Sequence, residues 1–448
     1  IRRPPRSTPK PSSAASDVYK RQIYMDRLNH FLNENGHESC IYSAVPEIEG
    51  YDNGSGNYKR LVLPYIKQAI KDYGVKLGGG IIFQDINSLH IPTNDYLDVL
   101  LAQLSREPKK DIGIVYLQTL FPENISEVID KLKPYFGTII TTSFDVESDY
   151  IAELVRSNQE NPSLTLLETF HKVKETLIEK VGHPENFKLM RKQNIPEVNY
   201  HLHLCHFHHE ILEYLKPSKG KDFVLHPLIS DKWIRDIDYG NHYQPVVKNP
   251  SDYTIGIINP IERKGKEIIS QVIAQTPYNF LILQGGWGDG ETFVASLKEE
   301  YGTDFSDRVR LGDYSQDIVG FFDMIDVFLF PSWIEGYGQV GHEALLRRTP
   351  VITTDYPAIQ QATIGKAKYV PLTEYFNIES WLMAIEDVFN NQPYWHFECN
   401  DAALMLLNRT QFNGQDFLLY LQTVHSESEK ENLDKAQAIH SNENLLED

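Results

Sequence analysis

Short apolar runs separated by helix-like segments fill most of the chain, and they form two series. Before the first series, apolar positions in residues 23–45 recur at helical spacing until Gly36, and a short strand follows. Short apolar runs bounded by polar residues indicate buried strands. Those of the first series lie at residues 79–86, 112–120, 136–143, 200–207 and 222–229. Because helix-like segments separate most of them, the pattern favours a mostly parallel sheet with both faces covered.

The second series follows the polar stretch 246–252 and alternates more regularly. It predicts helices at residues 263–276, at residues 291–301, from Asp317, from about Val340, and at residues 378–389. Strands are predicted at residues 253–258, 279–285, 308–312, 326–332, 350–354 and 367–371. We therefore expect two doubly wound, Rossmann-like α/β domains, one over residues 23–247 and one over residues 248–410.

The two ends of the chain fit neither domain. Residues 1–22 are basic and rich in Pro and Ser, which is typical of a transit peptide, but we favour a non-native leader because the stretch resembles translated sequencing-adaptor DNA. No strand or glycine-rich loop precedes the first helix, so we expect the first domain to lack its first strand. A last helix is predicted at residues 411–424, and residues 425–448 are expected to form a polar, acidic tail.

Composition excludes several classes of protein. A length of 448 residues fits two domains, and 41% hydrophobic with 23% charged residues is typical of a globular protein. The net charge of -19 argues against nucleic acid as a partner and permits at most peripheral contact with a membrane. Only three cysteines occur, far apart in the sequence, which suits a reducing compartment. We expect a cytoplasmic protein.

Residues 331–355 carry the most informative chemistry. Glu335 follows an apolar run, so it lies at the carboxyl end of a predicted strand, where ligands bind in such sheets. Gly336 and Gly338 let backbone N–H groups approach a ligand, and the next helix directs its positive end to the same place. Glu343, in the first turns of that helix, can accept hydrogen bonds from sugar hydroxyls. The segment suits a ligand that carries both phosphate and sugar. The simpler alternative is an ordinary strand, loop and helix, in which one acidic residue caps the helix and another lies on its solvated face.

The same segment resembles the signature of a known family. The matching positions are Pro331, Ser332, Glu335, Gly336, Tyr337, Gly338, Glu343 and the strand at residues 350–354. They are similar to the signature of retaining glycosyltransferases of the GT-B fold, the group 1 transferases often called family four. The resemblance extends over roughly residues 250–390 and is weak before them. It implies a GT-B fold, in which two Rossmann-like domains face a cleft that holds the donor.

The resemblance also implies roles for individual residues. Glu335 would contact hydroxyls of the donor sugar as a catalytic residue, and Glu343 would hold the ribose of the nucleotide. Backbone amides around Gly336, Tyr337 and Gly338 would lie against the sugar and the diphosphate.

Two basic residues are implied as partners of the leaving group. Lys264, a catalytic residue, would neutralise the departing diphosphate together with Arg263, and fixed cations there lower the barrier to bond breaking. Enzymes of this fold usually need no divalent metal, so we expect no metal and no cofactor. The chain departs from the family at Asn259, at His342, and at Arg348, where the family has glycine.

The function implied is transfer of a hexose from a nucleotide-diphosphate sugar to a glycan or lipid-linked acceptor, with retention of configuration, as in polysaccharide biosynthesis. Two alternatives stay open. A glycoside hydrolase would use Glu335 and Glu343 as its carboxylate pair and would need no nucleotide. A non-catalytic nucleotide-sugar-binding protein would keep Lys264 and Glu343 and turn nothing over.

A run of histidines in the first domain raises the question of a metal site. His201, His203, His206, His208 and His209 fall within nine residues, and alternate residues of a strand share one face. No acidic or cysteine ligand cluster completes the set nearby in the sequence. We therefore interpret the run as a strand followed by the start of a helix, without a metal.

Overall fold

The structure is a computed structural model of the chain. It describes residues 24, 27–39, 41–43, 58–60, 100–102, 104–116, 125–142, 200–207, 209, 222–229, 233, 248–261, 264–283, 290–312, 318–333 and 335–443. Two compact units are distinguished. Unit 1 comprises residues 1–96, 229–334 and 338–406, and unit 2 comprises residues 97–228, 335–337 and 407–448.

Unit 1 contains a six-stranded sheet in which every described pairing is parallel. Its strands are β7 (Thr254–Ile258), β8 (Asn279–Leu283), β9 (Val309–Gly312), β10 (Val327–Phe330), β11 (Val351–Thr354) and β12 (Lys368–Val370). Their spatial order is β12-β11-β10-β7-β8-β9. The direction of strand succession therefore reverses between β7 and β10, which is the doubly wound arrangement of dinucleotide-binding domains.

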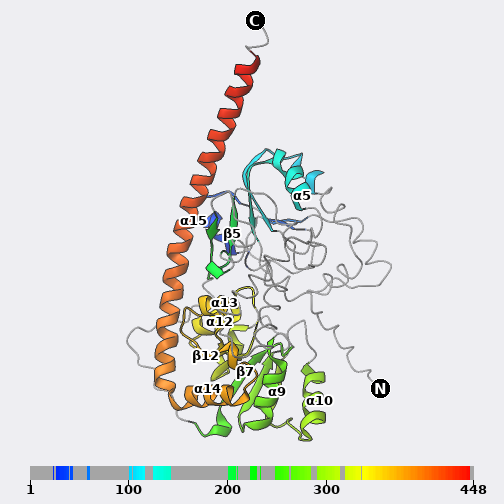
Figure 1. The fold of residues 1–448 in the computed structure, drawn as a ribbon, viewed down its shortest axis with the longest axis vertical. Coiled ribbons are helices and arrows are strands. Elements are labelled where there is room, and N and C mark those ends of the chain that lie inside the picture. Colours follow the sequence, from blue (N-terminus) through cyan, green and yellow to red (C-terminus); the bar gives the residue numbers. More distant parts are fainter. Residues whose placement is uncertain are drawn as a thin grey trace, which may run out of the picture. The chain divides into compact units, whose positions relative to one another are not determined.

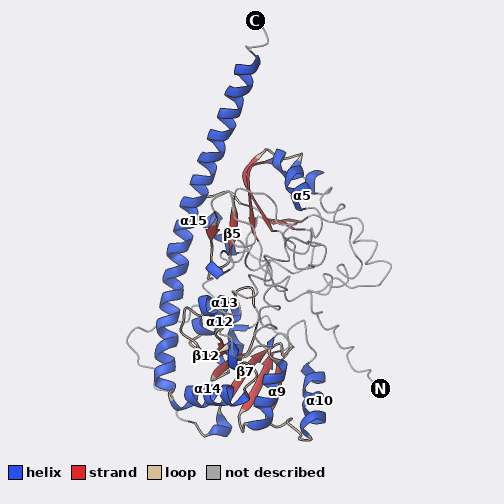
Figure 2. Cartoon of the chain, viewed as in Figure 1, coloured by secondary structure: helices blue, strands red, loops and turns tan. Residues whose placement is uncertain are grey.

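Helices follow most of these strands and pack in two groups. They are α9 (Lys266–Gln275), α10 (Gly290–Tyr301), α11 (Ile318–Asp323), α12 (Gln339–Leu346), α13 (Pro357–Ala362) and α14 (Ile378–Asn390). Helix α9 contacts α10 and α14, whereas α12 contacts α13. Right-handed crossovers before and after the reversal place successive helices on opposite faces of the sheet. Figures 1 and 2 show the labelled helices of unit 1 beside the strands of the sheet.

The strands form because they can be buried on both faces. Ile255, Ile257, Phe280, Ile282 and Phe328 have no exposed surface, and the intervening residues of β10 are buried as well. Continuous apolar runs of this kind are expected where helices cover both sides of a parallel sheet. The strands predicted between residues 253 and 371 and the helices predicted between residues 263 and 389 are all present. The short helix α13 was not predicted.

Unit 2 holds a second parallel sheet of four strands. They are β3 (Lys110–Tyr116), β4 (Phe136–Thr142), β5 (His201–His203) and β6 (Phe223–Val224), in this order in space, with α5 (Ile125–Leu132) between β3 and β4. This confirms the predicted strands at residues 112–120, 136–143, 200–207 and 222–229. The predicted strand at residues 79–86 lies outside the described residues. A separate pair, β1 (Ile41–Ser43) and β2 (Tyr58–Arg60), is also parallel.

The C-terminal part of the chain is one long helix, α15 (Gln392–Glu443), drawn from orange to red in Figure 1. The sequence predicted a helix only at residues 411–424 and a polar tail after it. In unit 2 the helix packs on the four-stranded sheet, with the ring of Phe417 5.6 Å from that of Phe223. Ser428 donates a hydrogen bond to the carbonyl of Gly137 at 3.0 Å, so its packing continues past residue 424.

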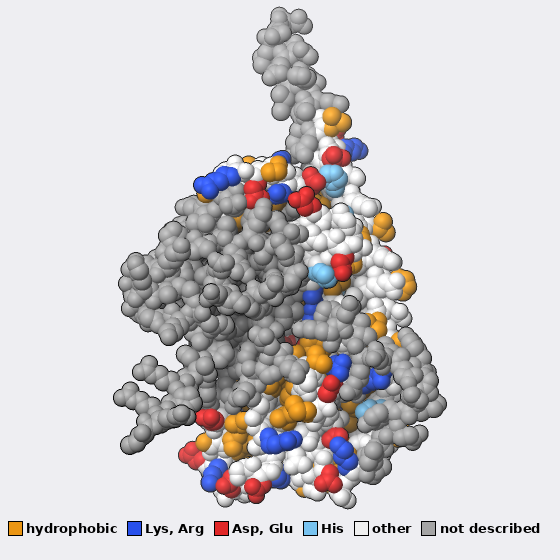
Figure 3. Space-filling view, turned by 180° about the vertical axis from the view of Figure 1, so that it is seen from behind, with side chains coloured by type: hydrophobic (Ala, Val, Ile, Leu, Met, Phe, Trp, Pro, Cys, Tyr) orange, Lys and Arg blue, Asp and Glu red, His pale blue; other side chains and the backbone are white. Residues whose placement is uncertain are grey.

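The outer surface carries both signs of charge. Figure 3 shows acidic and basic side chains lying side by side over the described parts of the visible face. Among the described residues, no helix combines the length and the apolar character needed to cross a membrane.

Candidate functional site

The reversal of strand order in unit 1 marks the place where a ligand is expected. Strands β7 and β10 are neighbours and run parallel, with Val327 paired to Ile255. Their carboxyl ends therefore lie at the same edge of the sheet. In open α/β sheets, ligands bind in the crevice outside the carboxyl ends of the strands at this switch point. The segment with Lys264 follows β7, and the segment with Ser332 follows β10.

The turn after β7 fits closely against the segment after β10. Gly265 has a left-handed backbone, with φ of 78°, and a Cβ atom there would lie 2.7 Å from Cγ of Pro331. Glycine is therefore required at this position both by its conformation and by the space. Lys264 is buried, and its Nζ lies 5.6 Å from the centre of the Phe330 ring. The turn thus holds Lys264 beside the carboxyl end of β10.

The segment after β10 is held by side chains that bind its backbone. The hydroxyl of Thr353 donates to the carbonyl of Phe330 at 2.8 Å, and that of Thr354 donates to the carbonyl of Ser332 at 2.7 Å. The phenol of Tyr375 donates to the carbonyl of Pro331 at 3.0 Å. Three consecutive carbonyl groups are therefore satisfied by buried donors, which holds this backbone in a single path.

Two helices begin at this edge of the sheet, and both begin with glycine. Gly265 is the N-cap of α9, and Gly338, with φ of 87°, is the N-cap of α12. Neither helix has a side-chain hydrogen bond at its cap. The first N–H groups of a helix have no partner within it, and they carry a partial positive charge. This end of unit 1 therefore favours an anion such as a phosphate.

Glu343 occupies the middle of α12 and is buried. Its Oε1 accepts a hydrogen bond from Nε2 of Gln339 at 2.9 Å, and it lies 3.5 Å from the guanidinium of Arg27. The sequence pattern predicted Glu343 but neither of these partners. Gln339 could have been found, because residues four apart on a helix are neighbours. Arg27 carries no local signal, since it lies far from Glu343 in the sequence.

Glu335–Tyr337, in the loop between β10 and α12, belong to unit 2. Tyr337 is buried, its hydroxyl accepts a hydrogen bond from the guanidinium of Arg409, and its ring lies 6.0 Å from that of His226. Burial raises the pKa of Tyr337 to about 12, although Arg409 opposes the shift. Its phenol is therefore neutral at physiological pH. Glu335 and Gly336 are half-buried.

Of the residues predicted for the site, Lys264, Gly338 and Glu343 lie in unit 1. Phe330 is a common neighbour of Lys264 and Gly338, because a Cβ atom at Gly338 would lie 3.5 Å from its ring. Arg263 lies outside the described residues. Arg348 stands where the resembling family has glycine, and its backbone is left-handed with φ of 60°. Glycine adopts that conformation more readily than arginine does.

Known proteins resemble the chain in fold and, in part, in sequence. Residues 262–391 match the sequence profile of the family described as glycosyl transferases group 1. No curated protein sequence matches the chain significantly. The sucrose-phosphate synthase of Thermosynechococcus elongatus has a similar structure, with a TM-score of 0.58 and 18% identity, covering 92% of this chain and 94% of that chain.

Two further structures are similar over most of their length. A trehalose-6-phosphate synthase, studied for glycosyl transfer with retention, has a TM-score of 0.51 and 11% identity, covering 89% of this chain and 96% of that chain. WaaG, a glycosyltransferase involved in lipopolysaccharide biosynthesis, has a TM-score of 0.50 and 13% identity, covering 91% of this chain and 96% of that chain. The chain thus has the mixed α/β fold of GT-B glycosyltransferases, and its residues 262–391 match the group 1 profile.

Proposed function

We propose that the chain is a retaining glycosyltransferase that moves a hexose from a nucleotide-diphosphate sugar to a hydroxyl group of a glycan or lipid-linked acceptor. The observation that carries this proposal is the meeting of two uncapped helix N-termini and a buried lysine at one edge of the unit 1 sheet. That combination supplies fixed positive charge where a doubly wound sheet binds its ligand.

The chemistry of the transfer explains why such a site is useful. As the bond between the sugar and the diphosphate breaks, negative charge grows on the diphosphate and positive charge grows on the sugar ring. Lys264 and the N-terminus of α12 would face the growing negative charge, and groups held in place beforehand need no reorganisation during the reaction. Glu343 would accept hydrogen bonds from the ribose hydroxyls, with Gln339 keeping the carboxylate in position.

The remaining residues of the predicted site complete the proposal. Glu335 would hold the donor sugar through its hydroxyls, and backbone amides of Gly336 and Tyr337 would approach the sugar and the diphosphate. Because the phenol of Tyr337 is engaged with Arg409, the role assigned to this residue uses only its backbone. Arg263 would add a second cation beside Lys264. No metal or cofactor is required for this reaction, since protein groups would balance the charge of the leaving group.

Similarity supports retention and the group of substrates. The trehalose-6-phosphate synthase with a similar fold was studied for transfer with retention, and WaaG is a glycosyltransferase involved in lipopolysaccharide biosynthesis. We propose a cytoplasmic location. The chain has few cysteines, which suits a reducing compartment, and nucleotide sugars are present in the cytoplasm.

Binding and turnover distinguish the proposal from its alternatives. A thermal-shift screen of the purified chain against UDP, GDP, ADP and dTDP sugars should identify one donor, and an acceptor assay with that donor should then show transfer. Donor binding without transfer or donor hydrolysis would instead support a non-catalytic binding protein. Cleavage of a plain glycan in the absence of any nucleotide sugar would support a glycoside hydrolase.

A further inference from the structure

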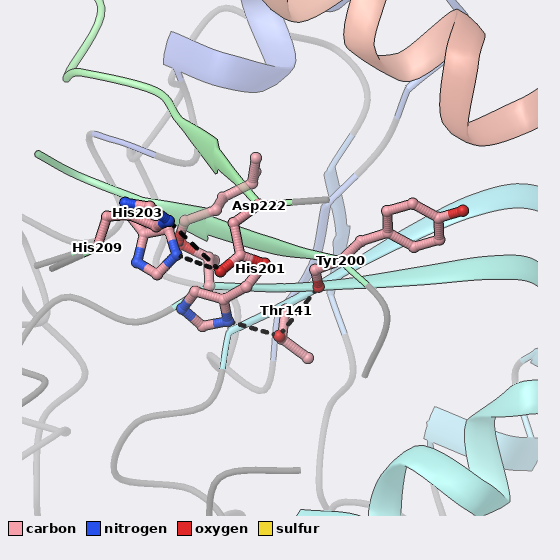
Figure 4. Close-up of polar contacts among 8 residues, drawn as sticks. Thr141, Tyr200, His201, His203, His209 and Asp222 are labelled. Atoms are coloured by element: carbon pink, nitrogen blue, oxygen red, sulfur yellow. Dashed lines mark hydrogen bonds and ion pairs between the residues drawn. The ribbon is translucent and has the colours of Figure 1, made fainter. Parts of the chain in front are cut away.

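Three side chains with metal-binding atoms meet in unit 2, and none of them is assigned to the donor. Nε2 of His203 lies 3.0 Å from Oδ2 of Asp222, and Nε2 of His209 lies 4.0 Å from the same oxygen. One ligand atom from each of the three residues lies within 4.8 Å of the others. Figure 4 shows the two imidazole rings and the carboxylate directed toward one another.

The fold creates this cluster through the pairing of two short parallel strands. Leu202 of β5 pairs with Phe223 of β6, and His203 pairs with Val224. Asp222 immediately precedes β6, and this register places it level with His201, on the same face of the pair as His203. The backbone N–H group of His209 donates to the carbonyl of Cys205 at 3.2 Å. The chain therefore turns after β5 and brings His209 back beside His203 and Asp222.

In the sequence, no acidic or cysteine ligand cluster completes the histidine run. In the structure, Asp222, the residue before β6, brings a carboxylate to two of these histidines. Two other histidines of the run are arranged differently. His201 is hydrogen-bonded through Nδ1 to the hydroxyl of Thr141 at 2.7 Å, and His206 is exposed. His208 lies outside the described residues.

His203 and Asp222 are both withdrawn from water. The side chain of His203 is 1% exposed, and that of Asp222 is 7% exposed. Buried groups of this kind are usually paired with one another or coordinate a metal ion.

The two ring nitrogens of His203 lie in different surroundings. With Nε2 hydrogen-bonded to an ionised carboxylate, the proton would lie on Nε2 and Nδ1 would be an acceptor. Nδ1 is buried and has no hydrogen-bond partner among the residues that the structure describes. If Nε2 bound a metal, the proton would move to Nδ1, and the imidazole and the carboxylate would both act as ligands without competing for one proton.

We propose that His203, His209 and Asp222 bind one divalent transition-metal ion of the zinc class. Two imidazoles and one carboxylate form a ligand set that such ions prefer, and water can complete the coordination. Ligands 2.0–2.1 Å from a tetrahedral zinc lie about 3.3 Å apart. The two imidazole nitrogens lie 3.0 and 4.0 Å from the carboxylate oxygen, and all three ligand atoms lie within 4.8 Å of one another. The side chain of His209 is 38% exposed, so its ring can close the longer gap.

The role assigned to the ion is to join three elements of unit 2. It would tie the end of β5, the turn after it and the start of β6, the last two strands of the four-stranded sheet. This inference is independent of the proposed transferase activity, because none of the three ligands is assigned to the donor. Metal binding and donor binding can therefore fail or succeed separately.

The test is a metal titration of the full chain without an affinity tag, after dialysis against a chelator. Cobalt serves as the probe because its visible absorption reports the coordination number, and zinc serves as the competitor. We expect saturable binding of one Co²⁺ per chain, with the intense absorption of a four- or five-coordinate ion that zinc then displaces. Zinc should also raise the melting temperature of the metal-free chain.

Variants locate the ion. His209→Gln is the main variant, because this side chain is partly exposed and its loss leaves the buried pair intact. It should weaken binding by about tenfold or more, since loss of outer-shell partners alone costs about 10 to 100-fold. Asp222→Asn should weaken binding similarly. His206→Gln removes an exposed neighbouring histidine outside the cluster and should bind Co²⁺ as the unmodified chain does.

Three outcomes would overturn the proposal. The first is a cobalt spectrum that stays that of the hydrated ion. The second is binding that His209→Gln and Asp222→Asn leave unchanged while both variants remain folded by circular dichroism. The third is binding that is lost equally in His206→Gln. Any of these would mean that His203 and Asp222 form only a hydrogen-bonded pair.

Discussion

Gln339 holds the carboxylate of Glu343 by a hydrogen bond of 2.9 Å from one turn earlier in α12. Both residues lie on the same side of the helix, because positions four apart are neighbours on its surface. The bond fixes one carboxylate oxygen and orients the other. In the proposed function, that carboxylate binds the ribose of the donor, so its orientation is part of the binding site.

Replacing Glu343 should therefore weaken nucleotide binding. Glu343→Ala should raise the dissociation constant of the nucleoside diphosphate more than it lowers kcat, because the ribose contact exists in the ground state and the transition state alike. Gln339→Ala should have a smaller effect of the same kind. Calorimetry with the verified nucleotide measures both. Glu299→Ala, on the exposed face of α10, is the control, and equal affinities for all three variants would contradict the assignment.

Replacing Lys264 should slow the chemical step. Lys264→Ala removes a cation that would face the departing diphosphate, and loss of one such group costs on the order of a hundredfold in kcat. Steady-state kinetics with the verified donor gives the value. Lys298→Ala is a matched control, since this exposed lysine forms an ion pair with the exposed carboxylate of Asp304 at 3.3 Å. Unchanged turnover in Lys264→Ala would remove this residue from the mechanism.

The anomeric configuration of the donor should survive in the product. Retention is part of the proposed function, because the signature at residues 331–343 resembles that of retaining enzymes. Proton NMR of the new glycosidic linkage, recorded early in the reaction, distinguishes the two configurations. An inverted product would exclude the proposed mechanism even if the donor and acceptor were identified correctly.

His226 should make unit 2 sensitive to acid. Burial is the main cause that lowers its pKa to about 3, and the charge of Arg409 adds to the shift. In the unfolded chain the pKa is about 6.5, so between pH 6.5 and 3 the unfolded state binds the additional proton. The stability contributed by neutral His226 is complete above pH 6.5 and is lost as the pH falls toward 3.

The slope of this loss approaches about 1.4 kcal/mol per pH unit for one such group. Melting curves of the unmodified chain and of His226→Gln at pH 7 and pH 5 test this expectation. The melting temperature of the variant should fall less between the two pH values. His30→Gln, which changes an exposed histidine, is the control, and equal pH dependence of His226→Gln and the unmodified chain would contradict the prediction.

Arg348→Gly should stabilise unit 1 slightly. The left-handed backbone at Arg348 costs a non-glycine residue about 1–2 kcal/mol, whereas glycine loses about 0.5–1 kcal/mol more entropy on folding. The expected net gain is therefore about 0.5 kcal/mol, measurable as a higher urea midpoint. Glycine at exposed Arg310 in β9, where the backbone is extended, should instead destabilise the chain.

The sequence predicted those features that depend on neighbours along the chain. The strands around Phe328 and Ile352 and the helix of Glu343 follow from local periodicity, and so does the position of Lys264 after a strand. Features that depend on contacts between distant parts of the chain could not be predicted. Asp222 joins His203 only through the register of β5 and β6, and Arg27 reaches Glu343 from a distant segment.

Two further differences between the predicted and the observed structure concern helix length. Helix α13 is only six residues long, which is too short to show a clear hydrophobic period. Helix α15 continues past residue 424 although its polar residues show no sustained apolar face, because Glu, Lys, Ala and Gln favour helices and pairs such as His425 with Glu429 lie four apart. An apolar face was therefore too strict a requirement for predicting its end.

The hydroxyl groups of Thr353, Thr354 and Tyr375 also determine which parts of the chain can be exchanged by protein engineering. They come from β11 and from the segment after β12, yet they fix the backbone after β10. A loop transplanted from a relative at residues 331–338 alone would meet donors placed for another backbone. A chimaera exchanged as one block over residues 327–375 keeps the hydroxyl groups and the carbonyls that they bind from the same parent, so this block preserves all three hydrogen bonds.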